Sequence, residues 1–305
     1  MKQLLSVATL SILFVIMLVF PQETFRGASN GLLLWYQTII PTLLPFIIMS
    51  NLLIQSNAVY YISRILAPVI KKLFCVSHYS CYAIIVGFLC GYPMGAKVIA
   101  DLVASGYIHK NEGQYLLSFC NNTSPMFIIS FIVLQSLKKP ELIFPTLLIL
   151  FISPIFCSLI FRTYYKNMII SERPSHSAKK ELHFNFCIFD TCIMNGFETI
   201  TKVGGYIILF SIFFSLCRNL PMNHFLPTLE ISNGIPWITK QSLPFHIKYT
   251  FILALTSFGG FCTIAQTYSM IHKTKLAIFP YIIQKLITSM VTSLLAICYI
   301  YFIHQ

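Results

Sequence analysis

The chain has 305 residues, of which 56% are hydrophobic and only 10% are charged, and its mean hydropathy is +0.76. A charged fraction so far below the roughly 25% of soluble domains indicates a polytopic membrane protein. The formal net charge of +12 does not indicate nucleic-acid binding, because the basic residues lie between apolar runs and form no continuous basic face.

Apolar runs of roughly 20 residues are long enough to cross a bilayer. Such runs occupy the segments 4–20, 32–54, 79–103, 114–136, 142–161, 203–218, 250–271 and 277–303. The first is interpreted as a retained membrane helix and not as a signal peptide, because no small-residue cleavage pattern follows it. Segments 58–73 and 185–202 are amphipathic and are expected at the membrane surface, or, for the second, along a cavity.

Three of the apolar runs are interrupted near their middle. "CGYPMG" interrupts 79–103, "NNTSP" interrupts 114–136 and "SFGGF" interrupts 250–271. Helix breaks at membrane depth are tolerated where the freed backbone groups face protein or a cavity instead of lipid. We therefore expect 79–103 and 250–271 to be re-entrant hairpins with glycines at their tips, and 114–136 to be a broken helix.

The two halves of the chain resemble each other. Similar runs begin with Asn-Gly at Asn30 and Asn195, and "GYPMGAK" at 91–97 aligns with "GFCTIAQ" at 260–266. The basic stretch 162–180 is expected in the cytoplasm, so that the first hairpin enters from the cytoplasm and the second from outside. This pattern predicts an inverted-topology repeat, the plan of many secondary transporters that bind their solute near the bilayer midplane.

The predicted fold is an all-α polytopic membrane protein in which each half contains a helix, a re-entrant hairpin and a broken or long helix. In chain order we predict an N-terminal transmembrane helix and loop, a first repeat, a linking transmembrane helix with a basic cytoplasmic loop, and a second repeat, at 1–29, 30–137, 138–184 and 185–305. No hydrolase, metalloprotease or phosphate-loop motif is present, so neither an enzyme nor a cofactor or metal site is expected. The coupling ion and the oligomeric state stay open.

The interruptions supply the candidate binding groups. The break at 121–124 offers two amides and two hydroxyls, and the helix that restarts at Pro125 presents unpaired N–H groups and a positive dipole end. Such a site suits an anionic group, whereas the alternative is a polar kink that bonds to its own helix. The predicted substrate-binding residues are Gly91, Tyr92, Pro93, Lys97, Asn121, Asn122, Thr123, Ser124, Gly259, Gly260, Gln266 and Lys285.

The charged candidates each have an alternative interpretation. Lys97 either binds the solute or only pairs with Asp101, four residues further along the same helix. Lys285 either faces the site or extends to the membrane interface. Asp101 and Glu198 are candidates for coupling or gating, although Glu198 also fits a carboxylate on the surface.

Four motifs in order, "GYPMGAKVIADLVASGYIHKNEGQYLLSFCNNTSPMFII", "IMNGFETITKVGGYIILFS", "LEISNG" and "FGGFCTIAQ", resemble the YlbJ family of sporulation integral membrane proteins. That family, also called stage V sporulation protein V, carries the nucleoside-recognition Gate domain of concentrative nucleoside transporters. The resemblance covers nearly the whole chain. This chain has Thr123 and Ser124 where the family more often has Ser-Gly.

The resemblance implies a role in endospore formation in a Firmicute. The protein would lie in the outer forespore membrane and move dipicolinic acid, a planar dianion, with the two hairpin tips and the broken helix forming the site. Two intramembrane lysines and helix N-termini could offset the cost of desolvating such a dianion. The alternatives are a nucleoside transporter, which would not need the lysines, and a membrane scaffold that recruits sporulation proteins without transporting a solute.

Overall fold

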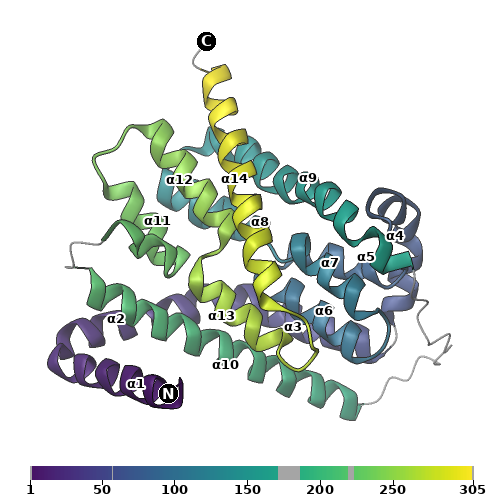
Figure 1. Ribbon diagram of the computed structural model, residues 1–305, viewed down its shortest axis with the longest axis horizontal. Coiled ribbons are helices and arrows are strands. Elements are labelled where there is room, and N and C mark those ends of the chain that lie inside the picture. The colour runs from purple at the N-terminus through teal and green to yellow at the C-terminus, as the bar shows by residue number, and fades with distance from the viewer. Residues whose placement is uncertain (1, 57, 171–185, 219–222, 304–305) are drawn as a thin grey trace.

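The computed structural model describes residues 2–56, 58–170, 186–218 and 223–303, and within these ranges its regular secondary structure is entirely helical (Figure 1). Six stretches are long and apolar enough to cross a membrane, with the bounds Pro21–Gln55, Lys110–Leu137, Pro140–Tyr165, Phe186–Cys217, Phe245–Ile271 and Ile278–Phe302. The prediction of a polytopic all-α membrane protein is thereby confirmed. Most of the expected basic loop, from residue 171 to residue 184, lies outside the described residues.

The N-terminal part contains a longer helix than the sequence predicts. Helix α1 (Lys2–Val19) is followed by α2 (Pro21–Leu34), the π-helical η1 (Trp35–Ile39) and α3 (Ile40–Gln55), which form one stretch of 35 residues. The predicted loop before residue 30 is therefore helical. Its polar sequence is accommodated because Gly27 and Gly31 bring α2 directly onto the backbone of α10 (Phe186–Cys217).

Helix α10 also continues where a break was predicted. The segment 185–202, expected as a separate amphipathic helix, begins a single helix of 32 residues. It lies along α2 and α3, as Figure 1 shows, and its Ile200 carbonyl accepts a hydrogen bond of 2.9 Å from the Trp35 indole. Burial of Cys192 and Thr199 against this partner explains why the polar residues of the segment do not place it at the membrane surface.

The interruption at residues 90–93 produces a helical hairpin. After α4 (Ala58–Phe74), the helices α5 (Ser80–Leu89) and α6 (Met94–Ala104) pack on each other, and neither is long enough to cross a membrane. Glycines on both helices, Gly87 and Gly95, face the Cys120 carbonyl with no space for a side chain. The segment 79–103 therefore contains a helical hairpin that lies directly on the next helix.

The interruption at "NNTSP" gives the predicted broken helix. Helix α7 (Lys110–Cys120) ends before residues 121–124, and the chain restarts as α8 (Pro125–Phe127), which continues as the π-helical η2 (Ile128–Leu137). A short 3-10 helix, η3 (Pro140–Leu142), then leads into α9 (Ile143–Ile170), which packs back along α7.

The prediction of a hairpin at 250–271 is wrong. Only Gly259 separates α12 (Phe245–Phe258) from α13 (Gly260–Ile271), and together they form one candidate span of 27 residues. Antiparallel helices need a connection of roughly 2–5 residues, whereas Gly259 and Gly260, with φ angles of 89° and 78°, change the helix direction without reversing it. The predicted pairing of 91–97 with 260–266 as two hairpin tips therefore does not hold. Helix α14 (Ile278–Ile303) follows and packs along α12.

A different segment folds back on itself in this half of the chain. The 3-10 helix η4 (Asn223–Thr228) packs against α11 (Ile231–Lys240), and Gly234 of α11 lies on the Pro227 backbone with no space for a Cβ atom. We call η4 with α11 the second hairpin, and α5 with α6 the first hairpin. Figure 1 shows α5 and α6 at one end of the bundle and α11 at the other.

Candidate functional site

The tip of the first hairpin touches both helix breaks. The Tyr92 hydroxyl donates to the carbonyls of Thr256 and Ser257, each at 3.2 Å, at the end of α12. A Cβ atom at Gly259 would lie 3.0 Å from Tyr92 Cζ, and one at Gly91 would lie 2.8 Å from the Ser124 nitrogen. The close approach expected of these glycine-bearing bends is therefore observed, although only one of them belongs to a hairpin.

The tip of the second hairpin reaches the same place. The Cys262 N–H donates to the Leu229 carbonyl at 2.9 Å, and a Cβ atom at Gly260 would lie 2.9 Å from the Thr228 oxygen. Four interruptions of helical structure thus meet, two at hairpin tips and two within candidate spans. Sequence reasoning did not predict the fourth, although the run "TLEISNG" contains a carboxylate, a hydroxyl and an amide immediately before and within a short helix.

A small cavity of about 70 Å³ lies among these four interruptions. Its lining includes Gly91, Tyr92, Thr123, Ser124 and Gln266 from the predicted set, together with Glu230 of the second hairpin. Threonines and serines of α3, α13 and neighbouring segments complete the polar part of the wall. Lys97, Asn121, Asn122 and Lys285 do not line it.

Asn121 joins three helices instead of facing the cavity. Its side chain is fully buried and its Nδ2 donates to the Thr267 and Tyr281 hydroxyls, each at 2.9 Å. Its Oδ1 accepts a hydrogen bond of 3.3 Å from the N–H of Ala96, in the first turn of α6. These bonds use both N–H donors of the amide and one acceptor position of its oxygen, so Asn121 fixes the break against α6, α13 and α14.

Lys285 supports the same break from α14. The residue is only 1% exposed, so its side chain does not extend to the membrane interface. Its Nζ donates to the Asn121 carbonyl at 2.9 Å and to Asn122 Oδ1 at 3.2 Å, and lies 5.1 Å from the centre of the Tyr92 ring. Burial of an ammonium group costs several kcal/mol, and these contacts offset part of that cost.

Thr123 and Ser124 fix the geometry of the break where it meets the cavity. Thr123 Oγ1 donates to the Thr256 carbonyl at 3.1 Å, which links the two broken spans. Ser124 Oγ accepts a hydrogen bond of 3.2 Å from the Phe127 N–H and so caps the restarted helix. Ser124 is only partly buried, because one side of it faces the cavity.

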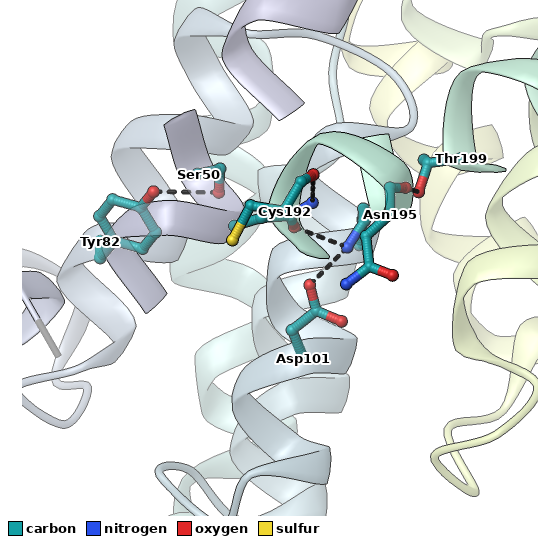
Figure 2. A network of polar contacts seen from close by, with 8 residues as sticks. Ser50, Tyr82, Asp101, Cys192, Asn195 and Thr199 are labelled. Atoms are coloured by element: carbon teal, nitrogen blue, oxygen red, sulfur yellow. Dashed lines mark hydrogen bonds and ion pairs between the residues drawn. The ribbon is translucent and has the colours of Figure 1, made fainter. Parts of the chain in front are cut away.

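Lys97 faces a separate cavity of about 200 Å³. Its Nζ lies 2.7 Å from Asp101 Oδ2 and 3.1 Å from Asn51 Oδ1. Figure 2 shows Asp101 next to Cys192 and Asn195 of α10, and Asn195 also lines this cavity. We call this space the Lys97 cavity, and the 70 Å³ space the central cavity.

The remaining acidic candidate lies on the surface. Glu198 is exposed and forms an ion pair with Lys202, four residues further along α10, so the geometry agrees with the surface alternative. Across the part of the chain that the structure describes, no group of three or more His, Cys, Asp or Glu side chains is arranged to hold a metal ion.

The chain is 25% identical over 306 residues to the sporulation integral membrane protein YlbJ of Bacillus subtilis (strain 168). It thus resembles a sporulation membrane protein. The similarity covers 88% of this chain and 75% of that relative. No family model and no solved structure matches the chain.

Proposed function

We propose that the protein is a transporter that moves dipicolinic acid across the outer forespore membrane of a sporulating Firmicute. The observation that carries the proposal is the meeting of four helix interruptions around one cavity, lined by apolar and polar side chains, in a chain with six candidate spans. Secondary transporters commonly bind their solute where discontinuous helices meet inside the membrane. The similarity to a sporulation integral membrane protein supports the cellular setting.

An inverted repeat in a revised register supports alternating access. We match α5–α6 with η4–α11, the broken span α7–α8–η2 with α12–α13, α9 with α14, and α2–α3 with α10. In this match, α6 of the first hairpin packs on α13, and α11 of the second hairpin packs on η2. If each candidate span crosses once, the two hairpins enter from opposite sides, as the separation of α5–α6 from α11 in Figure 1 suggests.

The environment of the central cavity favours a small anion. Helices α6 and α13 and the restarted helix at Pro125 begin beside it, and each helix N-terminus carries a positive dipole end. The volume of about 70 Å³ is far below the roughly 300 Å³ or more of pockets that hold drug-sized ligands. The structure is therefore a closed state, and the hairpins must separate before a planar aromatic dicarboxylate can enter.

Lys97 takes a different role from the one predicted. The Lys97 cavity lies where α3 and α6 end, beside Asn51 and Asp101, and is larger than the central cavity. We infer that it is an approach site on one side of the membrane, in which Lys97 attracts the anion before the central cavity opens. Asp101 then partners the ammonium whenever the anion is absent.

Nucleoside transport is the second candidate. It is favoured by one observation, because no lysine, arginine or histidine is among the described residues that line the central cavity. A neutral solute with several hydroxyl groups could bind the serine, threonine and glutamine side chains there. A scaffold without transport is the third alternative, and it predicts that cavity substitutions leave the function in sporulation unchanged.

Uptake of labelled dipicolinate into proteoliposomes tests the proposal. Gln266→Leu removes an amide from the cavity wall at nearly constant volume, and the loss of one hydrogen bond to a charged group predicts roughly a tenfold or larger decrease in uptake. Gln241→Leu, at an exposed position after α11, is the matched control and should transport normally. Competition by uridine or adenosine would support nucleoside transport, and no uptake above empty vesicles under any ion gradient would reject the proposal.

A further inference from the structure

Glu230 is a buried carboxylate in the wall of the central cavity. Among the described lining residues it is the only Asp, Glu, Lys, Arg or His, and it is 4% exposed. Its Oε1 accepts a hydrogen bond of 3.0 Å from the Ser232 N–H. Its Oε2 accepts bonds from the Asn233 N–H at 2.8 Å and from Asn233 Nδ2 at 3.0 Å. The side chain thereby caps α11, and the residue lines the cavity at which the four interruptions meet.

Among the side chains that the structure describes, no basic group donates to Glu230. From α13 the titratable group that faces it is the Cys262 thiol, and the Tyr92 phenol shares the cavity wall. Two basic residues of the neighbouring elements instead contact other parts of the second hairpin. Arg218 at the end of α10 lies 5.9 Å from the Trp237 ring, and Lys248 of α12 donates to the Thr239 carbonyl at 2.9 Å.

The remaining described neighbours of Glu230 are also without a nearby cation. Lys240 ends α11, roughly 15 Å along the helix from Glu230, and η2 contains no charged or titratable residue. Burial therefore raises the pKa of the Glu230 carboxyl, and the hydrogen bonds from Ser232 and Asn233 lower it by less. A buried carboxylate without a cationic partner is the kind of group that changes its protonation state when charge approaches it.

We propose that Glu230 takes up a proton when an anionic solute enters the central cavity, so that anion transport is coupled to proton movement. This inference rests on the proposed function. A dianion beside an ionised Glu230 would place three negative charges around a cavity that no described lysine or arginine lines. Protonation removes one of these charges, and the carboxylic O–H becomes a donor for a solute carboxylate.

The proton balance of this step is simple. A proton from the water on the entry side forms an O–H bond with one Glu230 oxygen, and no other covalent bond changes. The proton adds to Oε1, which accepts one hydrogen bond and has a second lone pair, so the N–H donors of Ser232 and Asn233 keep their acceptors. When the hairpins open toward the other side, the O–H bond breaks and the proton leaves with the anion.

The expected pH dependence follows from the direction of the pKa shift. The transport-competent form is the protonated one, so uptake should be fastest at pH values below the raised pKa of Glu230 and should decrease as the pH rises through it. Above that point the decrease approaches about tenfold per pH unit. Measurement between about pH 6 and pH 8.5 keeps both solute carboxylates ionised, since such groups titrate near pH 4.

Uptake of labelled dipicolinate into proteoliposomes is measured across this pH range for the wild type, E230Q and E198Q. The wild type and E198Q, whose exposed carboxylate pairs with Lys202, should lose uptake as the pH rises. E230Q should show the same uptake at every pH. A pH-independent wild type, or an E230Q variant that keeps the wild-type pH profile, would overturn the inference.

An infrared titration separates this inference from the proposed function and does not need transport. In membranes, the C=O band of a protonated carboxyl should decrease as the pH rises in the wild type and should be absent from the E230Q difference spectrum. If this band titrates while no dipicolinate uptake occurs at any pH, the proposed solute is wrong and the proton site stands. If uptake occurs but no Glu230 band titrates at any pH at which the protein stays folded, the proton site is wrong and the transport proposal stands.

Discussion

Replacement of Asn121 by alanine distinguishes a structural role from a solute-binding role. The side chain forms hydrogen bonds to the Thr267 hydroxyl, the Tyr281 hydroxyl and the Ala96 N–H, and it is fully buried. If these bonds fix the break, the substitution lowers the free energy of unfolding even without a solute. If Asn121 instead binds the solute, its removal affects transport and leaves the stability of the empty protein nearly unchanged.

The size of the decrease in the free energy of unfolding follows from the groups that lose a hydrogen-bond partner. Ala96 lies in the first turn of α6, so its N–H has no acceptor within that helix and becomes a buried unsatisfied donor, which costs about 2 kcal/mol. Thr267 and Tyr281 remain 3.5 Å apart and can still bond each other, so their loss is only about 1 kcal/mol. The expected destabilisation is therefore about 3 kcal/mol, or about 6 °C in the unfolding midpoint.

The assay is thermal unfolding of purified protein in detergent, with Asn195→Ala as the matched control. Asn195 is only partly buried, so its replacement should change the midpoint by about 1 °C or less. A Thr267→Val variant combined with Asn121→Ala should destabilise less than the sum of the two single variants, because the two side chains share one hydrogen bond. An unchanged midpoint together with lost dipicolinate uptake would refute the structural role.

Three further predictions concern the same region. Gly259→Ala should lower the free energy of unfolding by about 2 kcal/mol in thermal unfolding, because φ is 89° and a Cβ atom would lie 3.0 Å from Tyr92 Cζ; an unchanged midpoint contradicts this. Ser124→Ala should cost about 1 kcal/mol by removing a helix cap, seen as faster amide exchange in the restarted helix. Lys97→Met should raise the KM for uptake while the maximal rate stays constant, and a lower maximal rate at unchanged KM would place Lys97 in the central step.

The parts of the fold that depend on a strong local signal could be predicted from the sequence. The "GYPMG" run combines two glycines with a proline, and four residues separate the two helices of the first hairpin. Four consecutive polar residues in "NNTS" likewise mark a true break. In both cases the backbone cannot continue as a helix, so the local sequence decides the outcome.

The position of the second hairpin could not be predicted by the same reasoning. The prediction placed a hairpin at 250–271, where Gly259 and Gly260 indicate an interruption. Glycine permits both a bend and a reversal of the chain, and only the neighbouring elements select between them. The segment that does reverse, 223–240, is too short and too polar to be recognised as a membrane helix by hydropathy. The sequence features that could have indicated this hairpin are local: Pro227 and Gly234, which lie against each other, and Glu230, which caps the start of α11.

The lysines show why residue type alone does not define a site. Lys97 follows a helix break and Lys285 lies within an apolar run, which made both of them natural partners for a dianion. Which way a helical side chain faces depends on the packing of its helix, and here the two lysines bind different partners. One lines the Lys97 cavity and the other donates to the Asn121 carbonyl, so neither lines the central cavity.

The contacts around the central cavity are unequal, and this inequality indicates which part can move. The break at Asn121 is fixed to α6, α13 and α14 by hydrogen bonds from its own side chain and from Lys285. The tip of the second hairpin, by contrast, is joined to α13 by the bond from the Cys262 N–H to the Leu229 carbonyl, while the bonds of Glu230 stay within the hairpin. Separation of the second hairpin therefore breaks fewer interactions than separation of the first, and its motion carries the carboxylate of Glu230 with it. We therefore expect the element that opens the cavity to be the one that bears the proposed proton site, which is the arrangement that coupling of proton and anion movement requires.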